Sequence, residues 1–581
     1  MSNRRAGRTL RGNFLGSASR LGLAKAKIVF LPIVAGAAFA WGIGFDAEPA
    51  RAAAGVCAPD ASGTAAATGP IESCSGDFAT GISYPGAVGT AGSFEVDLNS
   101  VTNVADGGVI VSSGGAVNLT VTQFATAGNI SNLSGNGIDV TNFGANIAIT
   151  TVGATLRLRE SVSMASNCSL QAAATLRSMP RATSGAEWAV RARALSDRSR
   201  ATPGNVSITT AANTVVIGNG LTALVGSNVA IYASAADGNA DGVAGSVTVT
   251  LGNFTAVTLT NAANGAGISA DTFGDTGNVN VTLGNGATIT LNDGTANDAS
   301  GIYAVAQDTG NLLTGNVAVA LNSSVANHTT ITVTGDNNSA ITARSEGGGN
   351  VTVNTGVNNK LVVNGDTSFG VIATGLSTGA VNVTTGIGSD ITVNAGDGAG
   401  AIYGFSAGIY AFDGGGNIDV TANGAVAVFG FNAGNLTAPT YGIFAQTFGG
   451  GNVSVTATGG VTSQWGLGIG AFSVDGNIAV TSVGPITAAT YGIVAESSGT
   501  GNVTVTNSGN ISQPVFGIYA DTANGNLYVN NSGNISVTTK GINAFSTANG
   551  AVTVFGNMTT TTVGNITSFN NPNILVSAGT K

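Results

Sequence analysis

The stretch GNVTVTNSGNISQPVFGIYADTANGNLYV, residues 501–529, holds one complete unit of a repeat and the beginning of the next. Val503 and Val505 alternate with threonines, which is the period-two pattern of a strand with one buried face. Gly509-Asn510 and Gln513-Pro514 are turn sequences, and an apolar residue follows each of them. We therefore expect three short strands and three turns in about 25 residues, a unit size typical of solenoids.

Two anchor motifs recur on either side of this unit. Gly-Asn followed by an apolar residue recurs in steps of 25, 25 and 24 residues, and Gly-Ile-x-Ala recurs in steps of 26, 24, 25 and 24. The first motif begins at Gly451, Gly476, Gly501 and Gly525, and the second at Gly442, Gly468, Gly492, Gly517 and Gly541. The spacing predicts an all-β fold: a right-handed parallel β-helix with about 25 residues and three short strands per coil.

Stacked coils place equivalent residues above one another at about 4.8 Å. The asparagines of the first motif are therefore expected to form an amide ladder at one corner: Asn452, Asn477, Asn502 and Asn526. Three aromatic residues that precede the glycine of the second motif are expected to stack in the same way: Tyr441, Tyr491 and Phe516. Because both sets recur from coil to coil, we interpret them as structural and not as parts of a site.

The repeat is less regular before residue 442, and it indicates how the chain is divided. The Gly-Asn motif returns at longer steps, beginning at Gly204, Gly277, Gly315, Gly349 and Gly416. Residues 155–203 carry eight arginines and no anchor motif, as expected of a helical insertion or of compensating frameshifts in the gene. We expect this anomalous segment to be poorly ordered, helical or looped out. It separates an N-terminal cap with the first coils, 53–154, from the main parallel β-helix, 204–581.

Residues 1–52 have the parts of a secretory signal peptide. Basic residues precede an apolar run from Ile28 to Phe45, and Ala50-Arg51-Ala52 offers a cleavage site. A membrane anchor is the alternative reading, although a proline and three glycines interrupt the run. Export would place Cys57 and Cys74 in an oxidising compartment, where we expect a disulfide between them; two free thiols are the alternative.

The charge of the chain argues against nucleic-acid binding. The formal net charge is −9, and 16 of the 20 basic residues lie within residues 1–51 and 155–203. The rest of the sequence carries four basic residues against 24 acidic ones. Such a surface repels phosphate backbones, so we expect no nucleic-acid partner.

Few residues have the pattern of a catalytic or metal site. Gly404-Phe405-Ser406-Ala407-Gly408 matches a nucleophile elbow, but the one histidine, His328, lies upstream of the serine. Asp237, Asn239 and Asp241 match the first half of a calcium loop, while Thr248 stands where the loop needs a glutamate. These three residues indicate either a loose calcium site or a plain Asx-turn loop. We expect no catalytic residues and no other cofactor.

The signal peptide and repeats such as GNVTVTNSGNIS and YGIVAESSGTGNVTV resemble the passenger domains of bacterial autotransporters. The resemblance covers residues 75–581 apart from 155–203. It implies export to the periplasm and then to the cell surface, the outer membrane or the medium. Members of that family carry a C-terminal β-barrel translocator, whereas this sequence ends in SAGTK without barrel strands. The resemblance therefore predicts a passenger domain without its translocator.

Two functions follow from this reading. The first is an adhesin-like protein, not an enzyme, that binds glycans or proteins of a host, a matrix or a neighbouring cell, or associates with itself. The second is a β-helical polysaccharide-active enzyme, a lyase or a glycosidase. Three or more adjacent carboxylates on one face would favour the enzyme.

Overall fold

The computed structural model describes residues 56–59, 71–78, 82–84, 93–104, 109–113, 118–123, 129–132, 138–143, 146–151, 155–158, 188–195, 204–219, 229–236, 245–260, 265–274, 276–307, 315–395, 405–430, 439–548, 550–556 and 574–578. All of them belong to one compact unit, Pro49–Lys581. Every regular element in these ranges is a β-strand. None of the described residues forms a helix long and apolar enough to cross a membrane.

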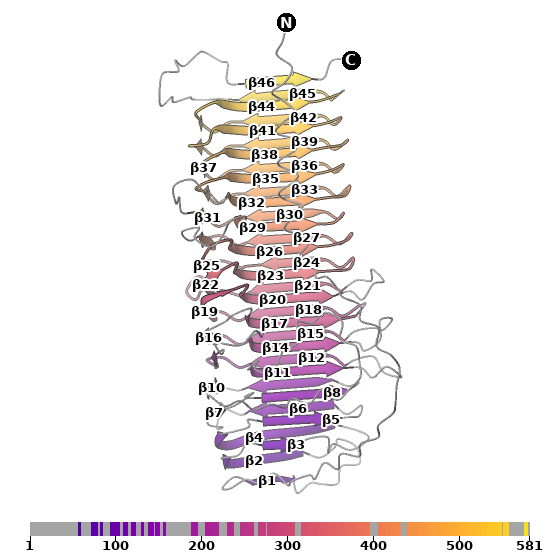
Figure 1. Ribbon diagram of the computed structural model, residues 1–581, viewed down its shortest axis with the longest axis vertical. Coiled ribbons are helices and arrows are strands. Elements are labelled where there is room, and N and C mark those ends of the chain that lie inside the picture. The colour runs from indigo at the N-terminus through magenta and orange to yellow at the C-terminus, as the bar shows by residue number, and fades with distance from the viewer. Residues whose placement is uncertain are drawn as a thin grey trace. The chain divides into compact units, whose positions relative to one another are not determined.

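The strands repeat in a fixed order, so that each coil supplies a first, a second and a third strand (Figure 1). First strands are β6 (Asn118–Gln123), β9 (Ile147–Thr151), β12 (Val206–Thr210), β15 (Val247–Leu251), β18 (Val279–Leu283), β21 (Val317–Leu321), β24 (Val351–Asn354), β27 (Val381–Thr385), β30 (Ile418–Ala422), β33 (Val453–Ala457), β36 (Ile478–Ser482), β39 (Val503–Asn507), β42 (Leu527–Asn531) and β45 (Val552–Gly556). Second strands are β7 (Asn129–Asn132), β10 (Thr155–Leu158), β13 (Val215–Asn219), β16 (Ala256–Thr260), β19 (Thr288–Asn297), β22 (Thr330–Asp336), β25 (Lys360–Asn364), β28 (Asp390–Asn394), β31 (Val426–Phe429), β34 (Val461–Ser463), β37 (Ile486–Ala488), β40 (Ile511–Ser512) and β43 (Ile535–Ser536). Third strands are β3 (Ile82–Tyr84), β5 (Val109–Ser113), β8 (Ile138–Phe143), β11 (Trp188–Leu195), β14 (Val229–Ala236), β17 (Ala266–Phe273), β20 (Ser300–Gln307), β23 (Ser339–Ser345), β26 (Phe369–Gly375), β29 (Ser406–Asp413), β32 (Thr440–Thr447), β35 (Leu467–Ser473), β38 (Tyr491–Ser497), β41 (Phe516–Thr522), β44 (Lys540–Ser546) and β46 (Ile574–Ala578).

Each strand pairs in parallel with its equivalents in the neighbouring coils. For example, β33 lies between β30 and β36, and β38 lies between β35 and β41. The third strands form one sheet of 16 strands. The first and second strands join in one sheet of 30, because the long strand β4 (Ser93–Val104) pairs with both β6 and β7. The predicted parallel β-helix with three strands per coil is confirmed.

The length of a coil varies along the stack. Equivalent asparagines are 24 or 25 residues apart from Asn452 to Asn526, as the sequence predicts. Between Asn205 and Asn452 the equivalent positions are 30 to 41 residues apart. The register of the first strands continues unchanged through these longer coils, whereas the second strands β19 and β22 shift register between Asn292 and Asn297.

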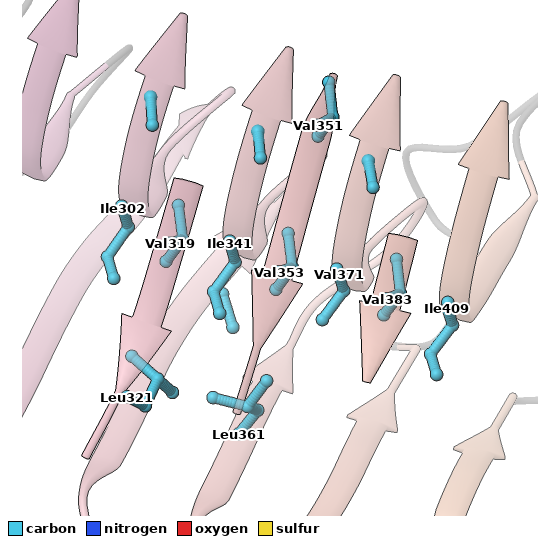
Figure 2. Packing of buried hydrophobic residues seen from close by; sticks show 14 of the residues in the cluster. Ile302, Val319, Leu321, Ile341, Val351, Val353, Leu361, Val371, Val383 and Ile409 are labelled. Atoms are coloured by element: carbon cyan, nitrogen blue, oxygen red, sulfur yellow. The ribbon is translucent and has the colours of Figure 1, made fainter. Parts of the chain in front are cut away.

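Aliphatic side chains from all three strands of each coil form a continuous core. Val353 on β24, Ile341 on β23 and Val371 on β26 are all fully buried and lie side by side in Figure 2. Burial of each such side chain stabilises the fold by about 1.5–3 kcal/mol. On β33 buried residues alternate with half-exposed ones, which matches the alternation of valine with serine or threonine in the sequence.

The glycine of the Gly-Ile-x-Ala motif is required by this core. A Cβ atom on Gly442 would overlap the Val461 side chain and approach the carbonyl oxygen of Gly468 at 2.6 Å. Any larger residue would therefore push the third strand away from the core. The same close approach recurs at Gly408, Gly468, Gly492 and Gly517, so packing sets the spacing of this motif.

The expectation that residues 155–203 lie outside the stack is wrong for two stretches. β10 pairs in parallel with β7 and β13, and β11 pairs in parallel with β8 and β14. Val190 on β11 is fully buried and lies in register with Ile138 and Ile231. The reason is local: the sequence WAVRARAL, residues 188–195, has a period of two and is compatible with a strand in spite of its arginines. Residues 159–187 lie outside the described part of the chain, and the frameshift remains a prediction.

The N-terminal end of the stack is closed by an antiparallel strand. β1 (Val56–Pro59) runs antiparallel to β2 (Ile71–Phe78), and β2 pairs in parallel with β4. This register places Cys57 directly opposite Cys74. Directly opposite residues of an antiparallel pair have Cα atoms about 4.5–5.5 Å apart, which lies within the range that a disulfide requires. The disulfide itself remains a prediction, and the signal peptide, 1–52, lies outside the described residues.

Candidate binding faces

The asparagine side chains at the corner before each first strand are bonded to the next coil. The backbone N–H groups of Asn477, Asn502 and Asn526 donate to the side-chain oxygen of the preceding asparagine at 2.9, 2.9 and 2.8 Å. The predicted ladder is thus confirmed, and the same bonding begins as early as Asn118. It is interrupted at Ala380, whose side chain offers no acceptor to the following coil. These amides hold coils together and are already occupied.

The predicted aromatic stack is confirmed for one pair only. The rings of Tyr491 and Phe516 are stacked, with centroids 4.9 Å apart and planes 15° apart. Tyr441 does not continue this stack, because Leu467 occupies the equivalent position in the coil between Tyr441 and Tyr491. Its ring instead contacts Phe405 at 5.1 Å and Phe444 at 5.3 Å.

The outer face of the third strands β26 to β35 carries a layer of aromatic rings that sequence reasoning missed. Phe405 lies at its centre, within 5.1–6.3 Å of four other rings: Phe369, Tyr410, Tyr441 and Phe444. Phe369 and Phe444 are each only 8% exposed, although both point away from the main core. Burial raises the pKa of Tyr410 to about 12. Each ring pair adds about 0.5–1.5 kcal/mol, so this layer acts as a second core.

The outer face of the first strands is different, because it carries a row of threonines. The strand register aligns Thr209 with Thr250 and Thr282, and farther along it aligns a second group of five threonines, from Thr384 to Thr506. The second group comprises Thr384, Thr421, Thr456, Thr481 and Thr506. All eight threonines are half-exposed or exposed. Neighbouring side chains in such a row lie about 4.8 Å apart.

The hydroxyl groups of these threonines form no hydrogen bond with the described part of the protein, whereas other hydroxyl groups do. On the second strands, the hydroxyls of Thr487 and Ser512 bond to each other at 3.2 Å. At the ends of the third strands, the buried hydroxyls of Ser473 and Thr522 donate to glycine carbonyls at 2.9 Å. We call the first-strand row of eight threonines the hydroxyl face. Asp419 is the one charged residue in the first strands from β12 to β42.

The residues that the sequence singled out for chemistry are not brought together. Asp237, Asn239 and Asp241 lie outside the described residues, so the calcium site remains a prediction. Ser406 is fully buried and accepts a hydrogen bond from the backbone N–H of Ser368 at 3.1 Å, while His328 is exposed between β21 and β22. In the described ranges no group of three or more histidine, cysteine, aspartate or glutamate side chains could hold a metal ion.

On the described third strands, one pair of carboxylates lies in adjacent coils. Glu496 on β38 is in register with Asp521 on β41, and the Tyr519 hydroxyl donates to Asp521 at 3.4 Å. Burial raises the pKa of Tyr519, and the charges of Asp521 and Glu496 raise it further. The tyrosine therefore stays protonated and remains a hydrogen-bond donor beside the two acids.

Comparison of the chain with protein-family models, with curated proteins and with solved structures finds no match. The fold and the two outer faces are therefore the observations on which a function is proposed.

Proposed function

We propose that the protein is an exported, adhesin-like passenger that acts by binding through its hydroxyl face. The observation that supports this proposal is the row of aligned threonines whose hydroxyls are not used within the described protein. Each hydroxyl can donate one hydrogen bond and accept two. Each also lies on a β-branched side chain, which holds it in a restricted rotamer.

The chemistry of the hydroxyl face fits a neutral, hydroxyl-rich partner. A glycan of a host, a matrix or a neighbouring cell offers many hydroxyls, and the hydroxyl face of a second copy of the protein would do so too. Individual hydrogen bonds of this kind contribute only about 0.5–1.5 kcal/mol. A row of equivalent contacts multiplies them, because every contact after the first is intramolecular.

Export and surface location belong to the same proposal. The signal-peptide pattern of residues 1–52 and the resemblance to autotransporter passengers support a route through the periplasm to the cell surface, the outer membrane or the medium. Attachment to the outer membrane would require a translocator. Fractionation of the producing cells tests this part: we expect a processed protein outside the cytoplasm, and an unprocessed cytoplasmic protein would contradict it.

The enzyme alternative has one specific observation in its favour, the carboxylate pair Glu496 and Asp521. Strands about 4.8 Å apart bring two such groups close to the separation found in retaining glycosidases. Incubation with a panel of polysaccharides distinguishes the two functions. We expect binding without release of sugars. Cleavage that is lost in Glu496→Gln and in Asp521→Asn would replace the binding proposal with a glycosidase.

A direct binding experiment uses the full mature chain on an array of neutral and acidic glycans, with whole cells as a second probe. We expect weak, avidity-dependent binding to neutral glycans and little binding to acidic ones, because most of the chain's charge is negative. Sedimentation of the same protein measures self-association. Absence of binding to glycans, to cells and to itself would leave the proposal without support.

A further inference from the structure

Near Asp413 the chain turns a corner at the end of each third strand, and in five coils a hydroxyl group links that corner to the coil below. The hydroxyls of Ser473, Ser497 and Thr522 donate to the carbonyl oxygens of Gly451, Gly476 and Gly501 at 2.9, 3.3 and 2.9 Å. The same hydroxyls accept from the following turn: the N–H of Gly476 donates to Ser473 at 2.9 Å, and that of Gly525 to Thr522 at 3.0 Å. The corner therefore needs a group that both donates and accepts.

Asp413 occupies this corner at the end of β29. It lies in register with Gly375 below and with Thr447 above, and it is fully buried. Its Oδ1 accepts hydrogen bonds from the backbone N–H groups of Gly415, at 2.8 Å, and of Gly416. Oδ1 thus replaces the accepting role of the hydroxyl.

The second oxygen of this carboxyl group has no hydrogen-bond partner in the described structure. Oδ2 of Asp413 is buried, and a Cβ atom on Gly375 would overlap it. The glycine therefore provides the space that the larger side chain fills. By position, the acceptor available to Oδ2 is the carbonyl of Gly379, which lies below Gly416 as Gly451 lies below Gly476.

Among the described residues, no charged side chain stabilises the carboxylate form of Asp413. Gly375 of β26 lies against its Oδ2, and the strand register places Thr447 of β32 on its other side. Burial raises the pKa of Asp413 to about 6, and the two backbone N–H groups only partly oppose this effect. No titratable or charged side chain contributes to the shift.

We propose that Asp413 is a proton-controlled latch between two coils. The latch is closed when Oδ2 carries a proton and donates a hydrogen bond to the carbonyl oxygen of Gly379. When that proton is released to water, a buried negative oxygen faces a carbonyl oxygen and the link to the coil below is lost. The corner formed by residues 376–380 and 414–416 then opens more readily. This inference does not depend on the proposed binding function.

The direction of the pH dependence follows from the raised pKa. The folded protein keeps the proton on Asp413 above pH 3.8, where an exposed aspartate loses it, so folding of this corner is favoured at low pH. The stability that protonated Asp413 gives to this corner is lost as the pH rises from 3.8 to about 6, and the loss is complete above that value. In this window the opening constant should rise about tenfold for each pH unit.

Hydrogen exchange of the wild-type protein tests the latch. The N–H groups of Gly414 and Phe448 donate between coils, to Gly375 at 2.9 Å and to Asp413 at 3.1 Å, and report on this corner. After correction for intrinsic exchange, we expect their protection to fall from pH 4 to pH 6 and to level off above. Protection that is constant or rises over this range would overturn the proposal.

Two variants separate the latch from a general effect of acid. Asp413→Ser installs the hydroxyl found in other coils, so its melting temperature should not share the fall between pH 4 and pH 6. Asp419→Asn removes an exposed carboxylate on the neighbouring strand β30 and should keep the wild-type profile. Identical pH profiles for the wild type and Asp413→Ser would overturn the proposal, and the exchange experiment decides if that variant does not fold.

Discussion

The outer faces of the first and third strands arise from the same coils but differ in what their side chains contact. On β26 to β35, rings such as Phe405 and Phe444 pack against one another and are largely buried. On β30 to β39, threonines such as Thr456 and Thr481 align in register, and their hydroxyls bond to no described group. An outward side chain that contacts its neighbours contributes to folding, whereas one that contacts only solvent is available to a partner.

The largest difference in stability should come from placing the same charge on the inner or on the outer face of a single strand. Val503 is fully buried on β39, and Thr504 beside it is exposed. Val503→Asp would place an unpaired charge in the core and should lower the free energy of unfolding by about 3–5 kcal/mol. Thr504→Asp should change it by less than about 0.5 kcal/mol. Urea denaturation measures both, and equal effects would mean that the two faces are assigned wrongly.

A smaller difference in stability should distinguish substitutions on the outer face of the third strands from those on the first strands. Phe444→Ala removes a ring that contacts Tyr410, Tyr441 and Phe472, and it should destabilise the protein by about 2–4 kcal/mol. Thr456→Ala on the first strands should cost less than about 0.5 kcal/mol. If thermal unfolding showed similar losses for the two variants, the threonine row would belong to the fold and not to a binding face.

The asparagine corner allows a prediction of increased stability. Ala380 interrupts the ladder, so the backbone N–H of Asn417 has no side-chain acceptor below it. Ala380→Asn should supply one and stabilise the protein by about 0.5–1 kcal/mol. Asn502→Ala, which removes the acceptor of the Asn526 N–H, should cost a similar amount. A shift of the same sign for both variants in chemical denaturation would contradict the ladder.

Much of the fold could be predicted from the sequence, because the third strands from β26 to β44 each carry a glycine where the strand lies close to the core. Gly442 leaves no room for a side chain beside Val461, and glycine recurs at this position in the neighbouring third strands, as at Gly408 and Gly468. Between residues 204 and 416 the period is hidden by insertions, which do not alter the register of the first strands. Strand β11 was missed because arginine suggested an insertion, while the alternation of residues 188–195 already matched a strand.

The outer faces could be predicted less well, because their properties depend on contacts between coils. Leu467 before Gly468 is visible in the sequence and would have shown that Tyr441 cannot stack on Tyr491. The position of Phe405 over the third strands has no periodic signal. Asp413 resembles any aspartate beside glycine until it is aligned, three residues before Gly416, with Ser473 before Gly476 and Thr522 before Gly525.

The measurement that tests the account most directly compares a variant of the hydroxyl face with the wild type, both in glycan binding and in stability. The variant Thr456→Val, Thr481→Val and Thr506→Val removes three aligned hydroxyls and keeps the branched shape of each side chain. Its unfolding should match that of the wild type, because none of these hydroxyls bonds within the described protein, while its binding to neutral glycans or cells should fall about tenfold or more. The control Thr487→Val removes a hydroxyl of the second strands, which bonds to Ser512, and should leave binding unchanged. Unaltered binding by the triple variant, or equal losses in the variant and the control, would contradict the assignment of the binding face.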